Sequence, residues 1–108
     1  MPNIKAKYFS GEVNCHYSTY SRSSGICIML YCATSHVQLC RATVCLPDHK
    51  LPGQHTWMNG WGTNEGLPEA LAKAGIIQLY PEFVKIGFDL AQMAKIIDPF
   101  YRPLDLVK

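Results

Sequence analysis

Charge is scarce in this chain of 108 residues, because only 17% of its residues are Asp, Glu, Lys or Arg. The net charge is +2, and the basic residues are spread along the chain without any run of Lys or Arg. Proteins that bind nucleic acid by neutralising phosphates usually carry a basic stripe. The charge pattern therefore disfavours nucleic-acid binding as the main function and leaves it open as an alternative.

Long apolar runs are also missing from the sequence. No stretch approaches the roughly 20 residues that a membrane-spanning helix requires. Residues 1–13 lack the apolar stretch that follows the charges of a secretory signal peptide. We therefore expect a cytoplasmic protein without membrane association. Its five cysteines are expected to stay reduced, since an odd number would leave one thiol unpaired in a disulfide framework.

The sequence contains none of the common catalytic motifs. It has no Gly-x-Ser-x-Gly elbow, no His-Glu-x-x-His metal motif and no phosphate-binding glycine loop followed by Lys and Ser or Thr. Cys15 and His16 are neighbours, and neighbours on a strand point to opposite faces, which argues against a nucleophile–base pair. Glu65 and Glu69 suit the positive end of a predicted helix better than acid–base work. We predict a protein that is not an enzyme and holds no cofactor.

Four cysteines flank a predicted hairpin centred on His36, namely Cys27, Cys32, Cys40 and Cys45. Such a hairpin would place Cys27 opposite Cys45 and Cys32 opposite Cys40. The two pairs would lie on opposite faces of the sheet, because Cys27 and Cys32 are five residues apart. Four thiolates would then not meet at one zinc ion, and no Cys-x-x-Cys spacing is present. A thiol or metal protein is the alternative; we expect these cysteines to pack as small apolar residues and predict no metal site.

Apolar residues are plentiful, at 48% of the chain, and predict a single domain over residues 1–108 with an irregular tail from about residue 98. Alternating or continuous apolar segments bounded by turn residues predict strands. The predicted strands are 3–9, 12–20, 26–33, 37–46 and, with weaker signals, 57–62.

One helix is predicted at about residues 65–74. Its apolar stripe recurs at helical spacing and consists of Leu67, Ala70, Leu71 and Ala74. Thr63 or Asn64 is a candidate N-cap, and Pro68 is tolerated in a first helical turn. Gly75 is expected to end the helix in the left-handed conformation, so that Ile76 can fold back on Leu71.

Candidate partner-binding residues are the aromatic and Arg side chains near predicted loops and strand ends: Tyr17, Tyr20, Arg22, Trp57 and Trp61. Trp, Tyr and Arg dominate the energetics of protein–protein interfaces. For the two tryptophans, burial in the core is the alternative interpretation.

Four segments together resemble a family of small proteins of unknown function from plasmids, conjugative elements, phages and their bacterial hosts. They are 5–13 (KAKYFSGEV), 46–48 (LPD), 64–76 (NEGLPEALAKAGI) and 87–88 (GF), of which 64–76 is the most specific. The resemblance extends to about residue 96. The family has acidic residues in the central hairpin and Asn at the position of Cys45, which indicates that the cysteines belong to this branch alone.

Residues 83–97 fit a helical heptad and a strand face equally well, and the resemblance favours a mainly β structure there. The predicted fold is α+β, a mostly antiparallel twisted sheet of about five or six strands with one short helix packed on it. The resemblance, the small size and the low charge suggest a non-enzymatic protein-binding module from a phage or mobile element. Its concrete form is an inhibitor of a bacterial defence complex, like an anti-CRISPR, acting by steric occlusion. The alternatives are a small nucleic-acid- or nucleotide-binding accessory protein and a thiol or metal protein.

Overall fold

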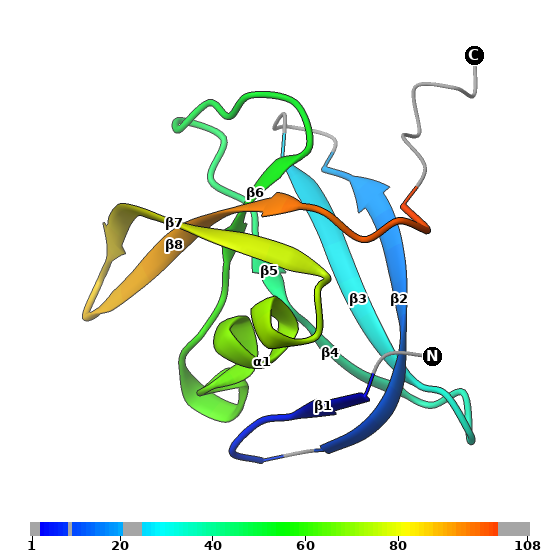
Figure 1. The fold of residues 1–108 in the computed structure, drawn as a ribbon. Coiled ribbons are helices and arrows are strands. Elements are labelled where there is room, and N and C mark those ends of the chain that lie inside the picture. The colour runs from blue at the N-terminus through cyan, green and yellow to red at the C-terminus, as the bar shows by residue number, and fades with distance from the viewer. Residues whose placement is uncertain (1–2, 9, 21–24, 102–108) are drawn as a thin grey trace.

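Two four-stranded antiparallel sheets and one short helix make up the fold in the computed structural model, which describes residues 3–8, 10–20 and 25–101 (Figure 1). The elements are β1 Asn3–Lys5, β2 Ser10–Thr19, β3 Ile26–Cys32, β4 Gln38–Arg41, β5 Thr43–Val44, β6 His55–Met58, the 3-10 helix η1 Gly62–Asn64, α1 Leu67–Lys73, β7 Ile77–Ile86 and β8 Asp89–Ile96. The strand order is β1-β2-β3-β4 in the first sheet and β5-β6-β8-β7 in the second. The α+β class and the antiparallel pairing are confirmed. The number of strands is not, because the described residues form eight strands in two sheets instead of five or six in one.

One of the two extra strands arises at Ala42. The segment predicted as a single strand from 37 to 46 divides there into β4, at the edge of the first sheet, and β5, at the edge of the second. Ala42 is fully buried, and its N–H donates to the carbonyl of Ile28 while its own carbonyl accepts the N–H of Asn59. The chain thus changes sheets within one residue.

The other extra strand comes from the C-terminal third, where β7 and β8 form a hairpin. Ile86 pairs with Asp89, so Gly87 and Phe88 are the two central residues of the turn. Gly87 has φ 61°, and glycine at the first central position is typical of a tight hairpin turn. The mainly β prediction for residues 83–97 is therefore correct, although the segment is two strands joined by a turn and not one continuous strand. The hairpin projects beyond α1 at the left of Figure 1.

The predicted cysteine pairing is also wrong. Cys40 lies opposite Leu30, with an irregularity in the ladder between Leu30 and Tyr31, and the N–H of Cys32 donates to the carbonyl of Val37. Cys45 follows β5 in the second sheet. The hairpin is not symmetric about His36, because the irregularity between Leu30 and Tyr31 shifts the register of the pairing. The residues after Ala42 then belong to the second sheet and no longer pair with β3.

The helix is where the sequence predicts it. Pro68 lies in its first turn, and Gly75 has φ 80° immediately beyond its end. The N–H of Ile76 donates to the carbonyl of Leu71, and that of Gly75 to the carbonyl of Ala72, which together form a Schellman motif. Neither Thr63 nor Asn64 caps the helix, whose N-cap is Gly66 without a side-chain bond.

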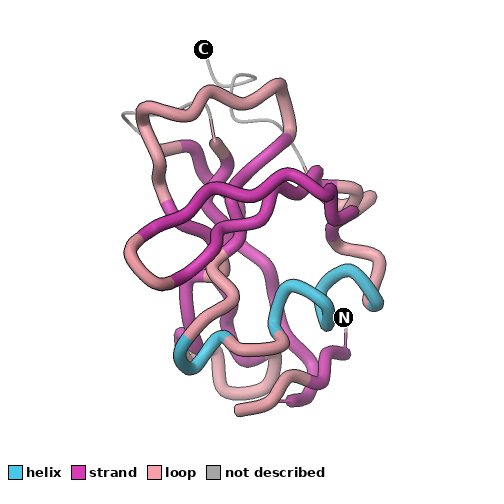
Figure 2. The backbone as a smooth tube through the Cα atoms, turned by 90° about the vertical axis from the view of Figure 1, so that its left-hand side faces the viewer, coloured by secondary structure: helices cyan, strands magenta, loops and turns pink. Residues whose placement is uncertain are grey.

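The main core lies between the two sheets and α1. Its fully buried side chains include Ile28 and Leu30 of β3, Met58 of β6, and Leu67 and Leu71 of α1. In Figure 2 the helix lies beside the N-terminal strand, where the N–H of Lys7 donates to the carbonyl of Glu65. A second, smaller cluster covers the other face of the second sheet and contains Leu51, Trp57 and Ala91. No helix in the described residues is long and apolar enough to cross a membrane.

We predict that Gly75→Ala destabilises the protein by about 1–2 kcal/mol, because the left-handed conformation raises the free energy of a residue with a Cβ by about this amount. An added Cβ would meet no atom within 4 Å, so the cost is conformational and not steric. Gly53→Ala is the matched control, since Gly53 is equally open and has no positive φ. Urea unfolding of both variants measures the difference. Equal stabilities would contradict the assigned role of Gly75.

Candidate functional site

The predicted partner-binding aromatics lie in two parts of the fold: Tyr17 in β2 and Tyr20 directly after it, and Trp57 and Trp61 in the second cluster. Tyr17, in β2, packs against the main core, and its hydroxyl donates to Oδ2 of Asp98 at 2.6 Å. The hydroxyl of Tyr20 shares a 2.7 Å hydrogen bond with Oγ1 of Thr43. Arg22 lies outside the described residues.

The two tryptophans belong to the second cluster. Trp57, in β6, is only 5% exposed, and its Nε1 donates to the carbonyl of His49 at 3.2 Å. Trp61 is half-buried and packs against the same cluster. These contacts fix the loop before β6 against the second sheet, which is a structural role for both indole rings.

The exposed apolar residues of the β7–β8 hairpin form a more accessible surface. Leu90 lies opposite Lys85, and Phe83 lies opposite Gln92. Because residues opposite each other in an antiparallel ladder share a face, Phe83 and Leu90 are diagonal neighbours on one side of the hairpin. Phe83 is 52% and Leu90 57% exposed, and Phe88 in the turn is fully exposed. We call Phe83, Phe88 and Leu90 the hairpin surface.

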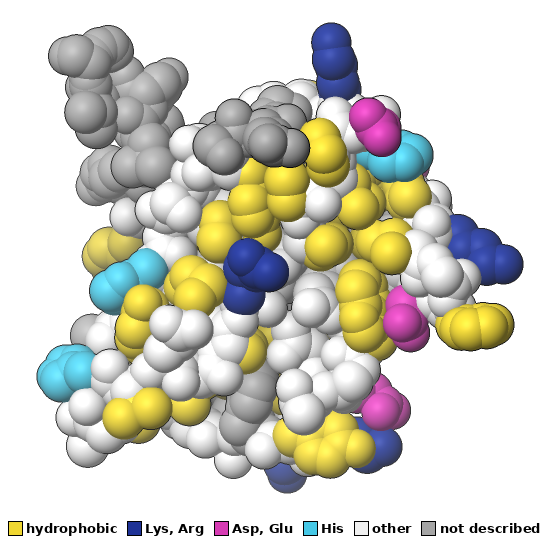
Figure 3. Space-filling view, turned by 180° about the vertical axis from the view of Figure 1, so that it is seen from behind, with side chains coloured by type: hydrophobic (Ala, Val, Ile, Leu, Met, Phe, Trp, Pro, Cys, Tyr) yellow, Lys and Arg dark blue, Asp and Glu magenta, His cyan; other side chains and the backbone are white. Residues whose placement is uncertain are grey.

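The opposite face of the hairpin is anchored to the body. Ala91 is fully buried in the second cluster, and Val84, Ile86 and Met93 pack against it. This packing holds the two strands in place and leaves the hairpin surface turned away from the second cluster. In Figure 3, seen from behind, a hydrophobic side chain protrudes at the right-hand edge, where the hairpin lies. Hydrophobic and uncharged side chains separate the Lys and Arg residues drawn on that face, so no basic stripe crosses its described part.

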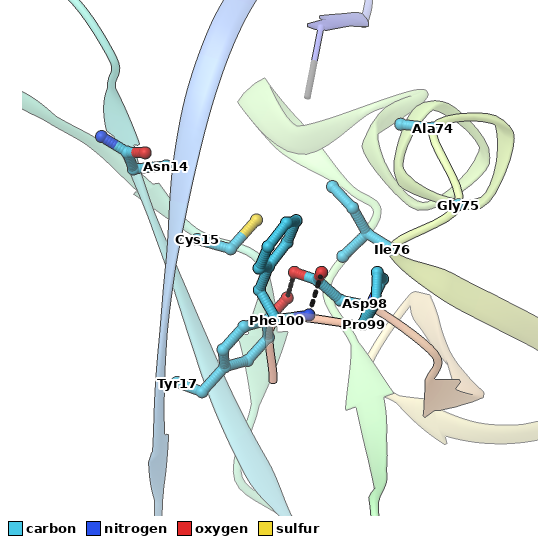
Figure 4. Close-up of a pocket in the computed structure, with 9 residues that line it drawn as sticks. All are labelled: Asn14, Cys15, Tyr17, Ala74, Gly75, Ile76, Asp98, Pro99 and Phe100. Atoms are coloured by element: carbon cyan, nitrogen blue, oxygen red, sulfur yellow. Dashed lines mark hydrogen bonds between the residues drawn. The ribbon is translucent and has the colours of Figure 1, made fainter. Parts of the chain in front are cut away.

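A third feature is a pocket beside β2, in which Cys15 and Tyr17 face Asp98 (Figure 4). Burial is the main reason that the pKa of the Cys15 thiol rises to about 11, although its hydrogen bond with Tyr17 acts in the opposite direction. Burial and the hydrogen bond to Asp98 raise the pKa of Tyr17 well above its usual value. Both groups keep their protons at neutral pH. A protonated thiol is a weak nucleophile, so the arrangement is suited to binding and not to attack on a substrate.

The remaining cysteines differ in environment. Cys40 is half-buried, and burial raises its pKa to about 11. Hydrogen bonds from Ser35, its side chain first, and from the backbone of Thr34 lower the pKa of Cys32. Within the described ranges, no group of three or more His, Cys, Asp or Glu side chains is arranged to hold a metal ion.

Comparison of the chain with protein-family models, curated proteins and solved structures finds no match in any of the three.

We predict that the free energy of unfolding falls as the pH rises from about 9 to 11. The Cys15 thiol has an ordinary pKa of 9.0 and a folded pKa of about 11, so in this interval the folded state binds more protons than the unfolded state. This contribution is complete below pH 9 and is lost as the pH rises through the folded pKa. Urea unfolding across the interval should show a shallower decline for Cys15→Ser.

Cys32→Ala is the control for this experiment, because the pKa of Cys32 is lowered and not raised. Its decline between pH 9 and 11 should be no shallower than that of the wild-type protein. A Cys15→Ser protein with the wild-type slope would show that the Cys15 thiol is not protected from ionisation in the fold.

Proposed function

We propose that the chain is a non-enzymatic protein-binding module that engages its partner through the hairpin surface. The full exposure of Phe88 at the tip of an anchored hairpin is the observation that supports this most directly. Large apolar side chains exposed together often mark an interaction site. Aromatic residues are also enriched in protein–protein interfaces relative to the rest of the surface.

Rigid presentation favours tight binding by this surface. A side chain on a mobile loop loses conformational freedom when it binds, and that loss reduces the affinity. Here the ladder of β7 and β8 and the packing of Ala91 fix the strands before any partner arrives. Phe88 then needs to lose only its own side-chain freedom. Full burial of a Phe side chain contributes about 1.5–3 kcal/mol.

The charge around the hairpin surface favours a protein over a nucleic acid. Lys85 lies opposite Leu90, while Glu82 and Asp89 are close in sequence, so neither sign dominates. A phosphate backbone would require an excess of positive charge at its contact surface. A concave apolar site on a protein would instead match the two phenylalanine rings.

The more specific form of the proposal is that the partner is a bacterial defence complex, which the protein inhibits by steric occlusion. The resemblance to proteins of plasmids, conjugative elements and phages supports this choice of partner. The small size also supports it, because occlusion needs only a stable contact and no catalytic machinery. The described part of the hairpin extends from the body in a way that suits insertion into a groove of a larger assembly (Figure 1).

A nucleic-acid-binding accessory protein is the second candidate, and one feature of the first sheet favours it. On the outer face of β2 and β3 the rings of His16 and Tyr31 are in contact, with their centroids 4.4 Å apart and their planes tilted by 36°. Arg41 lies opposite Met29 on the same face. Aromatic rings on which bases can stack, beside a cation, are typical of single-strand binding surfaces.

We predict that the triple variant Phe83→Ser, Phe88→Ser, Leu90→Ser loses binding and inhibition while it keeps the fold. The test is plaque formation by a phage on a bacterium whose CRISPR system targets that phage. The wild-type protein should raise the number of plaques, and the variant should not, because its hairpin no longer offers an apolar contact. Purification of the defence complex with each tagged protein provides the direct measure of binding.

Val37→Ser is the matched control, because Val37 is exposed to the same degree as Leu90 and lies in the connection between β3 and β4. It should behave as the wild-type protein. Full inhibition by the triple variant would exclude the hairpin surface as the contact. Binding of single-stranded DNA that weakens steeply with salt and is lost in Tyr31→Ala would favour the second candidate instead.

A further inference from the structure

The pocket beside β2 has a volume of about 540 Å³, which is a normal size for a small-molecule site. Its walls come from three parts of the chain. β2 contributes Cys15 and Tyr17, the connection between α1 and β7 contributes Ile76, and the segment after β8 contributes Asp98 and Phe100. Figure 4 shows Cys15 and Tyr17 pointing from β2 toward residues 98–100, whereas the side chain of Asn14 points away.

The polar end of the pocket is a positioned carboxylate. Oδ2 of Asp98 accepts the hydroxyl of Tyr17 at 2.6 Å, and Oδ1 accepts the N–H of Phe100 at 2.9 Å. The backbone beside it is held as well, because the N–H of Asp98 donates to the carbonyl of Ile76. A carboxylate offers about four acceptor positions, so these two bonds leave room for further donors. The site is thus prepared to accept hydrogen bonds from a ligand.

The charge of the pocket lining determines whether a cationic or an anionic ligand is favoured. No Lys, Arg or His is among its described lining residues, and Asp98 is the only one with an ionic side chain. Tyr17 and Cys15 remain neutral, as their raised pKa values require. An anionic ligand would therefore meet only repulsion, and a cation would gain a charge-assisted hydrogen bond.

The rest of the lining is apolar and aromatic. Ile76, Ala74 and Pro99 form one side, and the ring of Phe100, which is 82% exposed, lies at the solvent side. The ring of Tyr17 is packed edge-on against that of Tyr101, with centroids 5.1 Å apart. Aromatic rings near a carboxylate favour organic ammonium groups, since the ring faces attract cations while the apolar walls receive the ligand body.

We propose that this pocket binds a small organic amine in its protonated form. The ammonium group donates to Asp98, and the apolar or aromatic body lies against Ile76, Pro99 and Phe100. Hydrated metal cations are a poorer match, because most of the wall is apolar and only one carboxylate is present. This proposal is independent of the hairpin surface, which the pocket does not include.

Phenethylamine is a suitable probe, and phenethyl alcohol is its neutral counterpart of nearly equal shape. We expect saturable shifts of the amide signals of Cys15, Ile76 and Phe100 when ¹⁵N-labelled protein is titrated with phenethylamine at neutral pH. The alcohol should bind roughly tenfold more weakly or worse, because its hydroxyl can still donate to Asp98 but carries no positive charge to pair with the carboxylate. Equal affinity for the two probes, or no saturable shift with phenethylamine, would overturn the proposal.

Two variants locate the contact within the pocket. Asp98→Asn removes the charge and should weaken phenethylamine binding roughly tenfold or more and phenethyl alcohol binding clearly less, because only the amine loses an ion pair. Phe100→Ala removes an exposed ring without disturbing the core, so it keeps the test valid if Asp98→Asn does not fold. It should weaken both probes several-fold. Val37→Ser, far along the chain from the pocket lining, should bind phenethylamine as the wild-type protein does, and unchanged binding by both pocket variants would refute the site.

Discussion

The fold depends on a crossing of the chain between two sheets at a single buried residue. Ala42 follows the last residue of β4 and precedes the first of β5, and its N–H and carbonyl bond to Ile28 and Asn59 on the two sides. Asn64 completes the arrangement, since its Nδ2 donates to the carbonyls of Arg41 and Asn59 at 2.9 and 3.1 Å. A buried amide with both protons paired ties the crossing to the segment before α1. The position of the second sheet, and thus of the hairpin it carries, follows from this junction.

Local signals explain what was predictable from the sequence. Gly75 and the apolar stripe of 67–74 specify the helix and its end, because both act within a few residues. The crossing at Ala42 has no such signal: the residues on either side alternate as in one continuous strand. The residue that holds the two strands apart is Asn64, which bonds to the carbonyl of Arg41 beside the crossing. It lies more than 20 positions further along the chain, where its residue type predicts a helix N-cap. Its burial is decided by tertiary contacts, which override the local preference for a cap.

The candidate sites were harder to predict than the fold. The sequence predicts Tyr17 as a binding residue because it is an aromatic near a strand end, but its chemical setting depends on Asp98, which is 81 residues further along the chain. Phe83 and Leu90 fit the same helical heptad in the sequence, but such a periodic pattern shows only which residues share a face and not whether another element covers that face. They are exposed because the hairpin extends beyond the body. Trp57 follows the alternative interpretation given for the tryptophans, since it is buried and holds a loop through its bond to His49.

The pocket and the hairpin surface lie at opposite ends of the same two strands. β7 begins directly after Ile76 and ends at the turn, and β8 runs from the turn to Ile96, two residues before Asp98. The pairing is irregular between Leu79 and Phe83, so the ladder is interrupted between the two ends. A bulge of this kind bends a strand locally and increases its twist. The hairpin surface is held by the packing of Ala91, and the pocket by the hydrogen bonds of Asp98 with Tyr17 and Phe100, so each is constrained by its own contacts.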